Sequence, residues 1–133
     1  MTERILVTGA SGFVGTRLVK SLTALPSVSV TGVVRKQLES DCSEFESIGD
    51  LNADTDWSAL LQNKTVIIHT AARVHIMDDS ADEPITEFRK VNVAGTLNLA
   101  RQAASAGIER FVFISSIKVN GEQTQPGQYF KAD

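Results

Sequence analysis

Three glycines recur at three-residue spacing early in the chain, at Gly9, Gly12 and Gly15, between the apolar run 5–7 and a helical pattern. In a strand-to-helix turn the first glycine allows a sharp reversal, the second lets backbone amides approach a phosphate, and the third lets the helix pack closely on the strand. The spacing and its context therefore predict a turn that binds the pyrophosphate of a dinucleotide. The alternative is a structural turn that is rich in glycine for conformational reasons and holds no ligand.

The residues that follow distinguish two kinds of phosphate-binding loop. A nucleoside-triphosphatase loop would end in Gly-Lys-Ser/Thr, whereas Arg17 and Leu18 stand there. We therefore expect the first-turn amides of a helix, around Ser11, Phe13 and Val14, to face a pyrophosphate together with the positive end of the helix dipole.

The end of the second expected strand, Val33-Val34-Arg35-Lys36, carries two cations. In dinucleotide-binding sheets a carboxylate at this place bonds the ribose hydroxyls of NAD, whereas an arginine accommodates the 2′-phosphate of NADP. Because Arg35 can pair with a phosphate through two hydrogen bonds, the sequence favours NADP(H) over NAD. The alternative is a solvated basic loop without a ligand.

Two further segments follow strands at the same edge of the sheet. Asp50-Leu51 comes after the third strand, where the carboxylate could accept from the exocyclic amine of adenine or serve as an ordinary cap or turn residue. His69-Thr70-Ala71-Ala72 ends the fourth strand, and its small residues would let the ribose and phosphates of the cofactor pass close to the backbone. His69 stands in an apolar run, so we expect a hydrogen-bonded core histidine rather than a base.

Polar residues also mark the long helix and the fifth strand. Asn92 stands beside an apolar stripe, so its side chain should either bond backbone groups near the active-site strand or point outward. Ser115 and Ser116 end the fifth strand at the carboxyl edge, where ligands of open α/β sheets bind, although serines there are also ordinary turn residues. No Gly-x-Ser-x-Gly elbow accompanies them, and we reject a hydrolase triad.

The composition indicates one soluble domain. The 133 residues are 42% hydrophobic and 22% charged, with a formal charge of −3 that gives no electrostatic reason to bind nucleic acid or an anionic membrane.

Cys42, the single cysteine, excludes an intramolecular disulfide and is expected to be a spectator thiol near the surface. His75, in the loop after the fourth strand, could meet a substrate, but one cysteine and two histidines so placed do not predict a zinc site. The N-terminal apolar run is too short for a signal peptide or a membrane span, so we expect a cytoplasmic protein.

Apolar segments alternate between strand and helix patterns along the chain. Strands are expected at Arg4–Thr8, Val28–Val34, Glu44–Ile48, Thr65–Thr70 and Arg110–Ser115. Helices are expected after the glycine turn, near Asp56 or Trp57, and from about Asp82 to Ala106 before Gly107, the last with an inner stripe of Phe88, Val91, Gly95, Leu99 and Ala103. We expect Pro84 in the first turn of the long helix and Gly95 in close approach to the sheet. This alternation predicts an α/β fold with a doubly wound parallel sheet in the order 3-2-1-4-5.

Five ordered motifs carry a family resemblance. They are Thr8–Gly15, Gly49–Leu51, His69–Ala72, Asn92–Leu99 and Phe113–Gly121. Together they resemble the extended short-chain dehydrogenase/reductases, and more closely the nucleotide-sugar epimerase, dehydratase and 4-reductase branch. The resemblance spans essentially the whole chain and implies a Rossmann fold, an NAD(P) cofactor and, in a full-length parent, a nucleoside-diphosphate sugar.

The resemblance also implies roles for particular residues. Gly9, Gly12 and Gly15 would bind the pyrophosphate, Asp50 and Leu51 the adenine, and Ala71 and Ala72 the middle of the cofactor. Asn92 would be the motif asparagine. Ser116 would match the active-site Ser/Thr that hydrogen-bonds the sugar oxygen being oxidised or reduced, where a hydroxyl can stabilise negative charge during hydride transfer. The common Val-Tyr-Gly of the family is Val119-Asn120-Gly121 here, and many NAD-using relatives carry Asp where Arg35 stands.

The catalytic pair of the family is missing from these residues. Its members use Tyr-x-x-x-Lys, in which the phenol acts as general acid and base and the ammonium lowers the pKa of the phenol. The only tyrosine is Tyr129, and the residue four further on is Asp133. We therefore expect 1–133 to be the NAD(P)-binding domain of a longer enzyme, with 117–133 an irregular tail, and expect this piece to turn over nothing. Exposed sheet edges and apolar faces of such a piece favour a homo-oligomer or aggregation.

Three hypotheses of function follow. In the leading one the parent is an epimerase or 4-keto reductase that moves a hydride between NADP(H) and C4 of a nucleoside-diphosphate sugar. In the second the chain is a non-catalytic module that senses NADP(H) and regulates a partner. In the third the glycine loop holds no ligand and the domain is structural, which cofactor titration separates from the other two.

Overall fold

The computed structural model describes residues 2–36, 45–74 and 83–132, and its centre is one parallel sheet. The strands are β1 (Glu3–Thr8), β2 (Val28–Val34), β3 (Phe45–Ser47), β4 (Val66–His69) and β5 (Arg110–Phe113). All four pairings are parallel and the order is β3-β2-β1-β4-β5, which confirms the predicted sheet. The end of β5 lies two residues earlier than expected, so Ser115 stands beyond the strand.

The helices are α1 (Phe13–Thr23), α2 (Ser58–Leu61), α3 (Pro84–Arg89), the π-helical segment η1 (Lys90–Gly95), α4 (Thr96–Ser105) and the 3-10 helix η2 (Ile117–Asn120). The expected long helix is therefore built as α3, η1 and α4 in succession. Pro84 stands in its first turn as predicted, and Gly107, with φ of +75°, follows its end. The π-helical turn was not predicted, because the apolar stripe stays on one face through it, with Gly95, Leu99 and Ala103 all buried.

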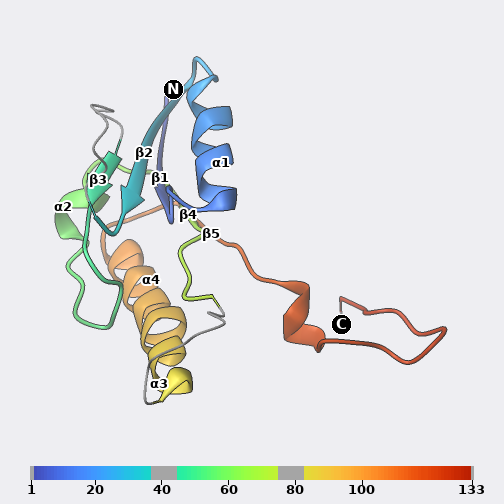
Figure 1. The fold of residues 1–133 in the computed structure, drawn as a ribbon. Coiled ribbons are helices and arrows are strands. Elements are labelled where there is room, and N and C mark those ends of the chain that lie inside the picture. Colours follow the sequence, from blue (N-terminus) through green and yellow to red (C-terminus); the bar gives the residue numbers. More distant parts are fainter. Residues whose placement is uncertain (1, 37–44, 75–82, 133) are drawn as a thin grey trace.

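Helices cover the two faces of the sheet, α1 on one and α4 on the other (Figure 1). Alternate side chains of β1 supply the two cores, because successive side chains of a strand point to opposite faces. Leu6 is fully buried in the core that includes Leu99 of α4. Val7 is fully buried in the core that includes Val19 of α1. The sheet is thus the middle layer of an α/β sandwich.

The helix α4 is hydrogen-bonded to the segment 50–57, which follows β3. A Cβ at Gly95 would lie 3.3 Å from the carbonyl carbon of Leu51. We had expected Gly95 to approach the sheet closely, but its close approach is to this segment. Asn98 Nδ2 donates to the carbonyl of Thr55 at 2.8 Å, and Gln102 Nε2 donates to the same carbonyl at 2.8 Å. The position of Asp50-Leu51 therefore depends on a helix that lies about fifty residues further along the chain.

The segment after β5 runs away from the sheet in Figure 1. It was expected to be irregular over 117–133, and η2 is its one short helical turn within the described residues. Phe113 and Ile114, where the segment leaves the sheet, are about half exposed, and Tyr129 is 86% exposed. None of the helices in the described ranges is long and apolar enough to cross a membrane. The expectations for Cys42, His75 and the helix start at Asp82 fall outside the described residues.

Candidate functional site

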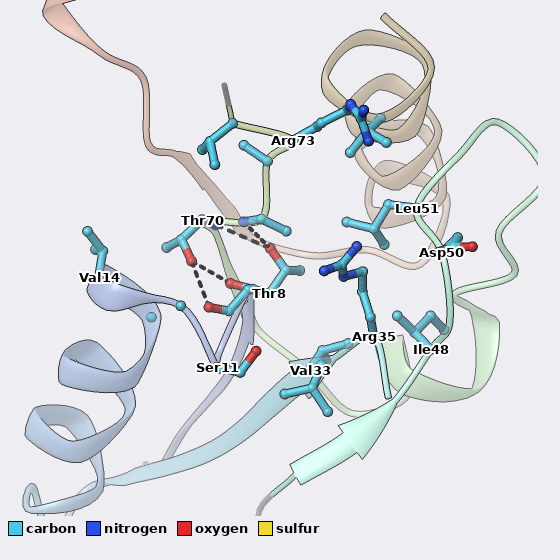
Figure 2. A pocket seen from close by; sticks show the side chains of 18 of the residues that line it. Thr8, Ser11, Val14, Val33, Arg35, Ile48, Asp50, Leu51, Thr70 and Arg73 are labelled. Carbon is cyan, nitrogen blue, oxygen red and sulfur yellow. Dashed lines mark hydrogen bonds between the residues drawn. The ribbon is translucent and has the colours of Figure 1, made fainter. Parts of the chain in front are cut away.

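A cavity of about 690 Å³ opens at the carboxyl ends of β1, β2 and β4 (Figure 2). Parallel strands present their carboxyl ends at one edge of a sheet, and ligands of open α/β folds bind there. The predicted site residues that line this cavity are Gly9, Ser11, Gly12, Phe13, Val14, Gly15, Arg35, Asp50, Leu51, Thr70, Ala71 and Ala72. The fold thus gathers residues from four separate segments of the sequence around one space.

The glycine turn forms the floor of the cavity beneath the first turn of α1. Gly9 has φ of +66°, the left-handed region that the predicted reversal requires. A Cβ at Gly15 would lie 2.0 Å from the carbonyl oxygen of Gly9, so the close packing is between α1 and the turn itself. Ala10 accepts from Thr16 Oγ1 at 3.0 Å, which ties the helix to the turn a second time. The first amides of α1 therefore open onto the cavity, where helix geometry leaves them without internal partners.

Arg35 extends from the end of β2 into the cavity, as Figure 2 shows. Its backbone is fixed, because its carbonyl accepts from the amide of Gly49 and from Ser47 Oγ, both at 3.1 Å. Within residues 2–36, 45–74 and 83–132 its guanidinium makes no hydrogen bond or ion pair. The fixed backbone, and a guanidinium without a partner among the described residues, suit the side chain to an anionic ligand.

Asp50 and Leu51 form a second wall of the cavity. Leu51 is 8% exposed and packs in the core, whereas Asp50 is exposed. The Asp50 carbonyl accepts from Thr55 Oγ1 at 2.9 Å, while its carboxylate bonds no other described residue. The carboxylate therefore caps no helix among the described residues, and its predicted contact with adenine stays a prediction.

The end of β4 is joined to the end of β1 by side-chain hydrogen bonds. Thr8 Oγ1 lies 3.2 Å from the amide nitrogens of both Thr70 and Ala71, and Thr70 Oγ1 donates to the carbonyl of Thr8 at 2.6 Å. His69 is 2% exposed and bonds Thr8 through Nδ1 at 2.7 Å. Burial lowers the pKa of His69 from 6.5 to about 4, because the charged form loses its hydration. The histidine is a hydrogen-bonded core residue, as predicted.

Asn92 lies beside the cavity and does not line it. Its Oδ1 accepts from the amide of Arg73 at 2.7 Å, and its Nδ2 donates to the carbonyl of Arg73 at 2.9 Å. Of the two predicted alternatives, the structure therefore shows the bond to backbone near the active-site strand. The guanidinium of Arg73 lies 5.6 Å from the centre of the Phe88 ring, which adds a contact between this loop and α3.

The structure does not bring Ser115 and Ser116 to the cavity. Both are exposed in the segment that leaves the sheet. Ser116 Oγ accepts from the amide of Lys118 at 3.2 Å and so caps η2. The role that the family resemblance implied for Ser116 is therefore not visible in the geometry of these residues.

Sequence reasoning missed several residues of the cavity wall. These are Thr8, Val33, Val34, Ile48, Trp57, Arg73, Val74, Glu87, Lys90 and Val91. Arg73 directly follows the His-Thr-Ala-Ala motif, and that position could have suggested it. Trp57 and Lys90 carry no such signal, because helices packed from elsewhere in the chain bring them to the cavity. Within the described ranges no three His, Cys, Asp or Glu side chains gather as metal ligands would.

A parallel sheet with a glycine turn, a helix N-terminus and a cavity at its carboxyl edge defines a dinucleotide-binding Rossmann domain. Residues 5–132 match the NAD dependent epimerase/dehydratase family. The chain belongs to this family.

The similar proteins include nucleotide-sugar enzymes and also 3-beta-hydroxysteroid dehydrogenases. The UDP-glucose 4-epimerase of Vibrio cholerae is 52% identical over 133 residues, which are 100% of this chain and 40% of that protein. MoeE5, solved with UDP-glucuronic acid and NAD, superposes with a TM-score of 0.74 at 32% identity over 91% of this chain and 39% of its own. The UDP-glucuronic acid 4-epimerase of Bacillus cereus, solved with NAD, gives 0.71 at 27% identity, with 92% and 42% covered. The chain thus spans about 40% of the length of these relatives.

Proposed function

We propose that this chain is the dinucleotide-binding part of a nucleoside-diphosphate-sugar epimerase or 4-keto reductase. The enzyme transfers a hydride between NAD(P) and C4 of the sugar. The observation that carries the proposal is the single cavity shared by the glycine turn, Arg35, Asp50-Leu51 and Thr70–Ala72. The UDP-glucose 4-epimerase of Vibrio cholerae and MoeE5, solved with UDP-glucuronic acid, support the substrate class.

Each wall of the cavity fits one part of the cofactor. The first amides of α1 suit the pyrophosphate, since they are unpaired donors at the positive end of a helix dipole. The carboxylate of Asp50, which has no partner among the described residues, suits the exocyclic amine of adenine, and the apolar Leu51 suits its ring face. Ala71 and Ala72 leave room for the middle of the cofactor, and the bound nicotinamide would supply the hydride donor or acceptor. Ser116 is proposed as the residue that hydrogen-bonds the reacting sugar oxygen.

We propose NADP(H) as the preferred cofactor because of Arg35. An arginine binds a phosphate through two parallel hydrogen bonds, and in dinucleotide-binding sheets an arginine near the end of the second strand accommodates the 2′-phosphate. The Bacillus cereus epimerase and MoeE5 were solved with NAD, so a preference for NADP(H) would distinguish this chain from them. Lys36, which is exposed beside Arg35, adds a second positive charge.

The 133 residues are proposed to bind cofactor and to catalyse nothing by themselves. The general acid and base of the family is a tyrosine with a lysine four residues later. Tyr129 is the only tyrosine, and Asp133 stands at the lysine position. A nucleoside-diphosphate sugar is then the partner of the full-length parent, which we place in the cytoplasm.

Calorimetric titration of NADP⁺ and NAD⁺ into the wild-type chain and Arg35→Ala tests the proposal. We expect the substitution to weaken NADP⁺ binding about ten-fold or more and to leave NAD⁺ binding unchanged, since a charged hydrogen bond is lost only with the phosphate. Arg101→Ala is the matched control, because Arg101 is exposed on α4 and does not line the cavity. An equal loss for both cofactors would contradict the NADP assignment. No binding of either cofactor at millimolar concentration would contradict the proposal as a whole.

A further inference from the structure

His69 forms a buried chain of hydrogen bonds that the proposed function does not use. Its Nδ1 lies 2.7 Å from Thr8 Oγ1, and its Nε2 lies 3.0 Å from Thr96 Oγ1. The ring of Phe113 stacks on the imidazole at 6.0 Å between centroids, and the ring of Phe111 lies 6.1 Å away. These hydrogen bonds thus connect α4, through the histidine, to the end of β1.

The partners of Thr8 determine which nitrogen of His69 carries the proton. A hydroxyl has one hydrogen and two lone pairs. The amides of Thr70 and Ala71, both 3.2 Å from Thr8 Oγ1, can only donate, so they occupy both lone pairs. The remaining contact of Thr8, to His69 Nδ1, must therefore use the hydroxyl hydrogen. Nδ1 accepts that hydrogen and carries none, so the proton of the neutral imidazole is on Nε2, which donates to Thr96.

We propose that His69, as the neutral tautomer with its proton on Nε2, is a positioning residue for the cofactor. It holds the Thr8 hydroxyl so that both lone pairs face the amides of Thr70 and Ala71. The proposal rests on the proposed function, because the loop it positions is the one assigned to the middle of the cofactor.

The loop after β4 has little freedom to move if the hydrogen bond between Thr8 and His69 is lost. A Cβ at Gly9 would lie 2.7 Å from the amide nitrogen of Ala71 and 2.8 Å from Thr70 Oγ1, so the glycine turn and the β4 loop are in contact. A rotation of the Thr8 hydroxyl toward another acceptor would leave at least one of the two amides without a partner. Because the two loops are adjacent and line one cavity, the change would alter the spacing between their cofactor-binding groups.

Two substitutions of His69 separate its two hydrogen bonds. The amide of asparagine branches at the same carbon as the imidazole, so His69→Asn keeps an acceptor near Nδ1 and loses the bond to Thr96. The amide of glutamine lies one carbon further, so His69→Gln keeps a donor near Nε2 and loses the bond to Thr8. We expect His69→Asn to bind NADP⁺ within about three-fold of wild type and His69→Gln to bind about ten-fold more weakly. A purely space-filling role predicts the reverse, because glutamine is closer to histidine in size, and that result would overturn the proposal.

Two substitutions of Thr8 test the proposal independently. Thr8→Ser keeps the hydroxyl and should restore binding that Thr8→Val loses. In Thr8→Val and His69→Gln the amides of Thr70 and Ala71 should exchange hydrogen faster than in wild type, and this readout needs no cofactor. Unchanged exchange in both variants would overturn the proposal.

The tautomer is measured directly on the wild-type chain by ¹⁵N NMR of the imidazole, with His75→Asn to assign the signals. We expect Nδ1 to resonate as an unprotonated nitrogen and Nε2 as a protonated one at neutral pH. A proton on Nδ1 would overturn the proposal whatever the variants do. Absence of NADP⁺ and NAD⁺ binding to wild type would overturn the proposed function and the cofactor role of His69 together, while the expected tautomer and exchange rates would still hold.

Discussion

Substitution of Gly15 by alanine should destabilise the domain by a predictable amount. The new Cβ would lie 2.0 Å from the carbonyl oxygen of Gly9 and 2.7 Å from its carbonyl carbon. Both are backbone atoms, so no side-chain rotation can relieve the clash, and α1 must retreat from the turn by about 1.4 Å to reach the 3.4 Å of ordinary contact. The retreat would also separate α1 from the amides and carbonyls that the turn presents to the cavity.

The magnitude follows from two opposing terms. Overpacking costs about 1–3 kcal/mol and more when backbone must move, whereas the exchange of glycine for alanine inside a helix stabilises by about 1 kcal/mol. Since the clash here is with backbone on one side only, we expect a net loss of about 2 kcal/mol or more. Gly95→Ala is the matched control, because its Cβ would lie 3.3 Å from the carbonyl carbon of Leu51, and the helix term should offset that contact.

Urea denaturation followed by circular dichroism measures both variants, with the wild-type slope as a check that the transition is unchanged. We expect Gly15→Ala to have a clearly lower midpoint and to lose cofactor binding, and Gly95→Ala to lie within about 0.5 kcal/mol of wild type. Equal stability of Gly15→Ala and wild type would refute the packing of α1 on the turn.

Three further predictions concern the same region. His69 is neutral in the fold because burial lowers its pKa from 6.5 to about 4. The free energy of unfolding should therefore be highest above pH 6.5 and fall by about 3 kcal/mol as the pH drops to 4. Urea midpoints across this range check the prediction, and His69→Phe should remove most of this pH dependence. Asn92→Ala removes two hydrogen bonds to the Arg73 backbone and should destabilise by about 2 kcal/mol, with faster amide exchange at Arg73 than in wild type. Trp57, the only tryptophan, lines the cavity, and its Nε1 is buried without a hydrogen bond to the described residues. Cofactor binding should therefore change the fluorescence of Trp57, and constant emission at saturating cofactor would contradict this prediction.

Local patterns predicted the elements that depend on local sequence. The strand Val28–Val34 was predicted with its observed bounds, because it is rich in β-branched residues and lies between polar residues. The strand order followed from alternating elements and right-handed crossovers. The reversal at Gly9 was predicted correctly because its left-handed backbone favours glycine, and Gly15 was predicted to allow close packing, although its contact is with the turn rather than with the strand.

Features that depend on long-range packing could not be predicted in this way. The bonds from Asn98 and Gln102 to the segment after β3 join residues more than forty positions apart. The π-helical turn at Lys90–Gly95 leaves the apolar stripe in place, so periodicity does not reveal it. His69 was expected to be satisfied in the core, but its partners Thr8 and Thr96 belong to different elements and only the fold brings them together.

The central claim is that a dinucleotide binds at the carboxyl edge of this sheet. Amide NMR spectra of the ¹⁵N-labelled chain, recorded during a titration with NADP⁺, test it most directly. We expect saturable shifts at 9–15, 35, 50–51 and 70–73, with the C-terminal turns of α1 and α4 unaffected. No shifts at millimolar NADP⁺ and NAD⁺, or shifts confined to residues outside the cavity, would contradict it.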